Sequence, residues 1–128
     1  ALQALASWEG CDAVIHLGVT GRSFFLEKLL SAVSTVEPGR KPSDYQHLLD
    51  GMDQWEHQFI KHSVGLMEKY QKPILGVTLT ADPKIKVIYE VGNCKYNGVF
   101  FNSPERAVNA LGHMCEYHDF LELEARRN

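Results

Sequence analysis

The stretch that decides the fold is Val99–Leu111, Val-Phe-Phe-Asn-Ser-Pro-Glu-Arg-Ala-Val-Asn-Ala-Leu. Its apolar run ends at Asn102, and Ser103 is placed to cap a helix whose first position is Pro104. Glu105 in the first turn complements the helix dipole. The stretch therefore predicts a buried strand that leads directly into a capped helix, which should extend to about residue 125. In open α/β sheets such a junction lies at the carboxyl edge, where ligands usually bind.

The composition is that of an ordinary globular domain. The 128 residues are 45% hydrophobic and carry a net charge of −3, which suits a single domain with a sizeable core. The charge argues against nucleic acid or an anionic membrane as the main partner. No apolar run is long enough to cross a bilayer. Three widely spaced cysteines favour free thiols in a reducing compartment, so we expect a cytoplasmic location.

Three further apolar or extended runs predict strands. Asp12–Val19 and Ile74–Thr80 are almost unbroken apolar runs, which is typical of strands buried on both faces of a parallel sheet. Lys86–Val91 is also expected to be extended. Either Gly92-Asn93 or Asn97-Gly98 could close a hairpin between that segment and the last strand.

Helices are predicted between these strands. Residues 1–8 have the pattern of a helix end, and Ser23 is expected to open a second helix. After a break rich in proline and glycine, Ser43 and Gln46 have the spacing of a capping box for a long helix that should run to Tyr70. The result is an α/β pattern with few strands. Because parallel sheets need more strands than this, we expect missing strands from preceding sequence or from a partner chain. The start at Ala1 rather than Met also favours a piece of something longer.

Parts of the chain resemble the NDP-forming acyl-CoA synthetases, the family of the ADP-forming acetyl-CoA synthetase and succinyl-CoA ligase. The resemblance rests on Val99–Leu111 with Tyr117, His118 and Phe120 after it, on Cys11–Val19 and on Gln71–Leu79. It implies a three-layer α/β/α flavodoxin-like domain with a mostly parallel, incomplete sheet. That single domain would cover residues 1–128, with a helical insertion at about 37–70.

The resemblance also implies a function. Such ligases interconvert an acyl-CoA, a nucleoside diphosphate and inorganic phosphate with free acid, CoA and a nucleoside triphosphate, through an acyl phosphate and a phosphohistidine. The parent enzyme would use CoA and ATP or ADP with Mg²⁺, and its other domains or subunits would be the partners. The family's histidine loop, CoA-binding Rossmann domain and ATP-grasp domain have no counterpart in these residues. We therefore expect no catalytic residue and no tightly bound cofactor here, but a structural and interface role near the CoA or nucleotide.

Two other functions stay open. One is a stand-alone binding or regulatory domain for a phosphorylated small molecule. The other is self-association into a homo-oligomer through the helical region Pro38–Tyr70, in which case Trp55→Ala should change the oligomer and preserve the fold.

Three turns are the candidate ligand site, because the carboxyl ends of parallel strands share one edge. Glycines permit close backbone approach, arginine offers a fork for phosphate, and helix N-termini attract anions. The candidate residues are Gly18, Thr20, Gly21, Arg22, Thr80, Asp82, Asn102 and Ser103. The alternative is that they are only turn and capping residues.

The histidines and cysteines give weaker signals. His16 lies inside a predicted strand, either as a hydrogen-bonded core histidine or as a phosphoryl acceptor. The other histidines include two pairs spaced five apart, which do not share a helix face, so no metal site is expected. Cys115 should be packed and Cys94 exposed on a turn.

Overall fold

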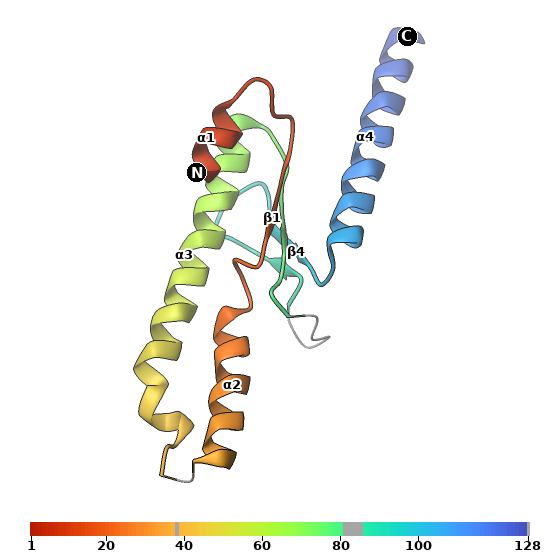
Figure 1. Cartoon of the computed structure of the whole chain (residues 1–128). Helices are drawn as coiled ribbons and strands as arrows, with labels where there is room; N and C mark the ends of the chain where they lie inside the picture. Colours follow the sequence, from red (N-terminus) through yellow and green to blue (C-terminus); the bar gives the residue numbers. More distant parts are fainter. Residues whose placement is uncertain (38, 81–85, 128) are drawn as a thin grey trace.

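The computed structural model describes residues 1–37, 39–80 and 86–127 of the chain (Figure 1). It contains both helices and parallel strands, as the sequence predicts. In chain order the elements are α1 (Leu2–Ser7), β1 (Val14–Leu17), α2 (Arg22–Val36), the 3-10 turn η1 (Pro42–Tyr45), α3 (Gln46–Tyr70), β2 (Ile74–Val77), β3 (Ile88–Tyr89), β4 (Gly98–Phe101) and α4 (Pro104–Arg127). The protein is an α/β fold.

The described strands form one sheet in the order β1-β2-β4-β3. β1, β2 and β4 are parallel, and β3 pairs antiparallel with β4. The hairpin turn is at Gly92-Asn93, where Gly92 adopts a φ of 48° that favours glycine. The predicted strands are confirmed in position. The first three are shorter than predicted, with two to four residues each, and β4 begins one residue earlier than the predicted Val99.

Helices cover both faces of the sheet. α1 packs on α3, and the second half of α3 packs on β2 and β4. α4 contacts β1, β2 and β4 and lies on the opposite side of the strands from α3 (Figure 1). A core cluster of Ala6, Val14, Leu66 and Ile74 joins α1, α3 and the first two strands.

Beneath α3, a glycine makes room for two rings. The Phe100 ring is 2% exposed and meets the His16 ring edge-on, with 5.5 Å between centroids. Phe59 of α3 closes over His16 at 5.0 Å. A Cβ added to Gly76 would stand 2.1 Å from Phe100 and 2.8 Å from His16. Because that space is filled, no larger residue fits at this point of β2.

β1 differs from its predicted burial. The sequence predicts burial on both faces, yet Leu17 is 62% exposed, while every residue of β2 is buried. Within the described part of the chain β1 pairs only with β2, so it is an edge strand. That position explains the exposed Leu17.

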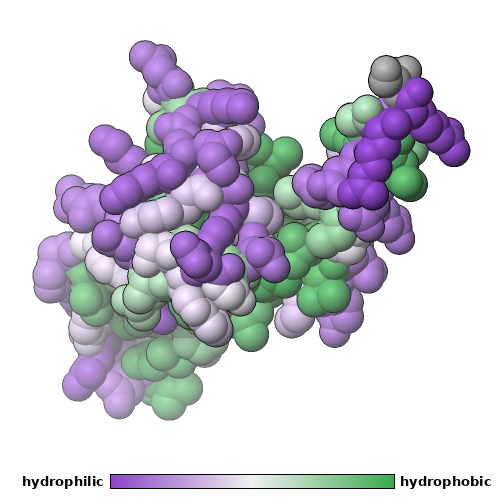
Figure 2. Space-filling view, turned by 90° about the horizontal axis from the view of Figure 1, so that it is seen from above, coloured by the Kyte–Doolittle hydropathy of each residue, from purple (hydrophilic) through white to green (hydrophobic). Residues whose placement is uncertain are grey.

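α4 is longer than the sheet it covers. Its 24 residues span about 36 Å, against about 13 Å for a four-residue strand. Ala107 is buried, but the later part of the helix stands apart from the body and carries hydrophobic side chains on its surface (Figure 2). The prediction that Cys115 is packed is therefore wrong, since Cys115 lies on this exposed part, and Cys94 is half-buried.

Two helix starts also differ from prediction. α2 begins at Arg22, with Gly21 in the capping position, one residue before the predicted Ser23. The predicted capping box at the start of α3 does not form. Instead the Lys41 N–H donates to Asp44 Oδ2 at 3.0 Å within η1, and Gln46 donates to Asp50. No helix in the described ranges is both long and apolar enough to cross a membrane.

Candidate functional site

The carboxyl ends of the three parallel strands lie along one edge of the sheet. Leu17 is in register with Val77, and Val77 with Phe101. The bonding continues past the strand ends, because the Gly18 N–H donates to the Val77 oxygen and the Thr78 N–H to the Phe101 oxygen, both at 2.9 Å. The turns that follow β1, β2 and β4 therefore begin side by side. Asp82 lies outside the described residues.

The turn after β1 is built on two glycines and bonded to the turn after β2. Gly18 and Gly21 have φ values of 65° and 83°, where L-residues are strained. The Leu79 N–H donates to the Thr20 oxygen at 2.9 Å, and a Cβ on Gly21 would stand 3.4 Å from Thr80 Oγ1. These contacts fix the first turn of α2 directly beside β2.

Glu56 of α3 occupies the N-terminus of α2. The Gly21 N–H donates to Glu56 Oε2 at 3.1 Å, and the N–H groups of Arg22 and Ser23 donate to Glu56 Oε1 at 2.7 and 3.3 Å. These are the donors that a phosphate would use at a helix N-terminus. In this structure the anion that binds them is the chain's own carboxylate.

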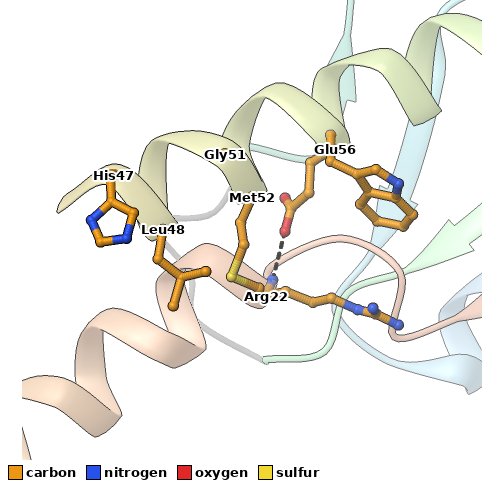
Figure 3. Close-up of a pocket in the computed structure, with 7 residues that line it drawn as sticks. Arg22, His47, Leu48, Gly51, Met52 and Glu56 are labelled. Atoms are coloured by element: carbon orange, nitrogen blue, oxygen red, sulfur yellow. Dashed lines mark hydrogen bonds between the residues drawn. The ribbon is translucent and has the colours of Figure 1, made fainter. Parts of the chain in front are cut away.

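Arg22 is turned away from this carboxylate. Its Nε donates to the Gly18 oxygen at 3.0 Å, and its guanidinium lies 5.5 Å from the centroid of the Trp55 ring. Figure 3 shows the Arg22 backbone bonded to Glu56 while the Arg22 side chain extends away from Met52. The predicted phosphate fork is thus engaged with a carbonyl and an aromatic ring.

A hollow of about 220 Å³ lies behind Glu56, where Gly21 and Ser23 of the α2 start meet Lys86 and Tyr89. Burial and, second, the charge of Glu56 raise the pKa of the Tyr89 phenol. Glu56 therefore acts on two groups that line this hollow: it accepts hydrogen bonds from Gly21 and Ser23, and its charge raises the pKa of Tyr89.

Two hydroxyl groups next to the first turn of α2 have no hydrogen-bond partner among the described residues. Thr20 is 1% exposed, and its Oγ1 is buried without a partner, as is Thr80 Oγ1. The Thr78 hydroxyl, by contrast, donates to the Thr80 oxygen at 2.7 Å. Unsatisfied buried hydroxyls cost about 1–3 kcal/mol each, so among the described residues Thr20 and Thr80 carry an energetic cost at this edge.

The turn after β4 is capped locally. Ser103 Oγ accepts from the Arg106 N–H at 3.4 Å, and the Ala107 N–H bonds the Ser103 oxygen. The backbone N–H of Glu105, and second the Ser103 hydroxyl, hold the pKa of the exposed Glu105 carboxyl below its usual range. Asn102 and Ser103 are half-buried beside this cap. Ser103 thus performs the capping role that the sequence predicts.

His16 is packed among aromatic rings. Both ring nitrogens are buried without a hydrogen-bond partner, although the residue as a whole is half-buried. Burial lowers the pKa of the imidazole from 6.5 to about 4. We expected a core histidine with hydrogen bonds. The ring is enclosed as expected, but its neighbours are Phe59 and Phe100, so the predicted hydrogen bonds are wrong.

Sequence reasoning missed Glu56. Glu56 is 33–35 residues from the N–H groups that it accepts from, and no local spacing marks such a cap. Within the described ranges no three histidine, cysteine or acidic side chains gather as a metal site would need. Comparison of the chain with protein-family models, with curated proteins and with solved structures found no match.

Proposed function

We propose that this chain is part of the flavodoxin-like domain of an NDP-forming acyl-CoA synthetase-like ligase, where it forms an interface near the CoA or nucleotide and does not carry the phosphohistidine. The observation that carries the proposal is Glu56. Its carboxylate binds three N–H groups at the start of α2, so the anion-binding position at this edge is filled from within.

The Ser-Pro-Glu-Arg-Ala junction supports the family assignment. It starts α4 with Pro104 at the first helical position, directly after the parallel strand β4. The open edge of β1 is what an incomplete flavodoxin-like sheet would present, because such sheets continue on that side.

The histidines support a role without a nucleophile. His16 is enclosed by Phe59 and Phe100, and an uncharged, shielded imidazole is a poor phosphoryl acceptor. The other five histidines lie on exposed parts of helices and not on a glycine-rich loop. They are His47, His57, His62, His113 and His118.

One observation favours a second function, a stand-alone domain that binds a phosphorylated small molecule. The unpartnered hydroxyls of Thr20 and Thr80 lie beside the first turn and could donate to a phosphate. That function requires Glu56 to leave its three N–H groups, and the negative charge of Glu56 opposes a phosphate that approaches it.

The test compares these 128 residues with the complete product of the gene that encodes them. Each is incubated with short-chain acids, CoA and Mg-ATP, and acyl-CoA and ADP are measured together with phosphohistidine by intact mass. We expect acyl-CoA from the complete product only, with the phosphoryl group outside residues 1–128. Phosphorylation of a histidine within these residues, or a complete product without CoA ligase activity, would contradict the proposal.

A further inference from the structure

α2, η1 and the first part of α3 form a two-helix arm, defined as residues 22–59, that extends beyond the carboxyl edge of the sheet (Figure 1). No described residue of the arm is buried, and along α3 burial begins at Ile60. The boundary between the arm and the body therefore lies at Phe59 and Ile60. Because regions with little buried surface open at the lowest cost in free energy, the arm is the part of this fold that we expect to open first.

The His16 ring of β1 lies against this boundary. It meets Phe59 edge-on, with 5.0 Å between ring centroids, and Phe100 of β4 at 5.5 Å. A Cβ added to Gly76 of β2 would stand 2.8 Å from the imidazole, so the neighbouring strand leaves no free space on its side. Phe100 is 2% exposed and belongs to a paired strand, whereas Phe59 is the last residue of the arm. Of the groups around the imidazole, Phe59 is therefore the one that can move.

A protonated His16 has needs that this position does not meet. Both ring nitrogens are buried, and neither has a hydrogen-bond partner among the described residues. A protonated imidazole carries two N–H donors and a charge, and a buried charge without partners is costly. Burial accordingly lowers the pKa of the ring from 6.5 to about 4. The charged ring needs water, and water reaches it when Phe59 moves away.

The charged groups of the surrounding elements do not offset this cost. β2 and β4 carry no titratable residue, and β1 carries none besides His16. On α3, Glu56 lies one turn before Phe59 but is engaged with the α2 start, and the other charged residues between 53 and 62 are exposed. Arg22 donates to a carbonyl oxygen of the turn after β1. Tyr89 of β3 packs against a β4 ring, and its raised pKa keeps it uncharged. Burial is therefore what sets the lowered pKa of His16.

Movement of Phe59 also moves the groups that hold the two helices of the arm together. Glu56, one turn earlier on α3, accepts from three N–H groups at the start of α2. The Phe59 ring stacks on Trp55 at 5.6 Å, and the Trp55 ring carries the Arg22 guanidinium at 5.5 Å. These contacts between α3 and the α2 start lie within about one turn of Phe59, so they should break together.

We propose that His16 is an acid-operated trigger at the base of the two-helix arm. When His16 takes up a proton, α3 leaves the sheet at Phe59, and the Glu56 carboxylate releases the N–H groups of the α2 start. The neutral ring keeps the arm closed. This inference goes beyond the ligase function proposed above, because it concerns the movement of the arm and holds whatever the chain binds.

The test is amide hydrogen exchange of the 128-residue chain by NMR at pH 7 and at pH 5, with each rate corrected for the intrinsic effect of pH. A pKa of 6.5 with the arm open and about 4 with it closed raises the ratio of open to closed arm about 20-fold between these pH values, and partial solvent contact reduces this to about 10-fold. Protection of the Gly21, Arg22 and Ser23 amides should therefore fall about 10-fold. The Arg106 amide, which Ser103 caps, is the internal control and should keep its protection.

His16→Phe removes the titrating group and keeps a ring beside Phe59, so the three amides should be equally protected at both pH values. His16→Leu is smaller and gives the same readout if the phenylalanine ring does not fit. His57→Gln is the matched control, since it removes an exposed histidine of the same helix and should leave the acid effect as in the wild type.

Three results would overturn the inference. The first is a wild-type chain whose three amides keep their protection at pH 5. The second is a loss that persists in the His16 variants, which would assign the opening to another group; ordinary glutamates stay ionised at pH 5 and are a poor explanation for it. The third is an equal loss at the Arg106 amide, because that would be unfolding of the whole chain and not of the arm.

Discussion

The two strand-to-helix junctions at the sheet edge solve the same problem in different ways. After β4, the helix N-terminus is capped by Ser103, one residue before the helix, whereas after β1 the three free N–H groups of the α2 start are capped by Glu56 from another helix. A local cap stabilises its own helix alone. A distant cap also ties α2 to α3, so its loss should affect the whole two-helix arm.

The largest expected effect is therefore at the distant cap. Glu56→Ala leaves three N–H groups without an acceptor and removes a charge that complements the helix dipole, so we expect a loss of about 2–3 kcal/mol in the free energy of unfolding. Urea unfolding measures it. Asp53→Ala, an exposed acidic residue one turn away, should change the stability by less than about 0.5 kcal/mol. Equal losses in the two variants would show that Glu56 is not a cap.

The second expected effect is a loss of stability in acid at β1, where His16 is enclosed. The folded pKa of about 4 lies below the ordinary 6.5, so between these values the unfolded chain binds a proton that the folded chain does not. Stability from this source is therefore complete above pH 6.5 and is lost as the pH falls towards 4. The full difference corresponds to at most about 3 kcal/mol, and partial solvent contact of the ring reduces it to about 1–2 kcal/mol.

His16→Phe tests this expectation, because it keeps an aromatic ring between Phe59 and Phe100 and removes the titrating group. Unfolding in urea at pH 7 and at pH 4.5 should show a smaller pH dependence in the variant than in the wild type. An identical pH dependence would place the acid sensitivity elsewhere in the chain.

The smallest expected effect is at the local cap. Ser103→Ala removes the side-chain acceptor for the Arg106 N–H and should cost about 1 kcal/mol. Hydrogen exchange should be faster at the amides in the first turn of α4 and unchanged in α2. Faster exchange in α2 as well would mean that the two junctions are coupled. It would contradict the statement that the Ser103 cap stabilises α4 alone.

The same contrast explains what sequence reasoning could reach. The local patterns were sufficient for the order of elements, the positions of the strands and the Ser103 cap, because each depends on neighbouring residues. The Glu56 cap and the open edge of β1 depend on how distant segments meet, and no spacing encodes that. The exposed Cys115 was missed for a related reason, since the periodic pattern of α4 continues beyond the sheet that it covers.

The candidate site likewise has a part that local sequence predicts and a part that depends on a distant residue. The sequence indicates that Gly18, Gly21 and Arg22 lie in a turn at the carboxyl edge of the sheet. The structure has Gly18 directly after β1, and Gly21 and Arg22 at the start of α2 beside the turn after β2. What the sequence could not indicate is that the position is already filled, because the filling carboxylate comes from the middle of α3. A sequence can therefore predict a helix N-terminus as a phosphate site. Whether its N–H groups are free depends on the side chains that other elements bring next to it.

The most direct test of the central claim follows the amide signals of Gly21, Arg22 and Ser23 by NMR while inorganic phosphate, ADP and CoA are added separately to the 128-residue chain. We expect no saturable shift at these three amides, because the Glu56 carboxylate accepts a hydrogen bond from each of them. A saturable shift there with any of the three ligands would show that the position is open to a phosphate, and would favour the binding domain over the interface role.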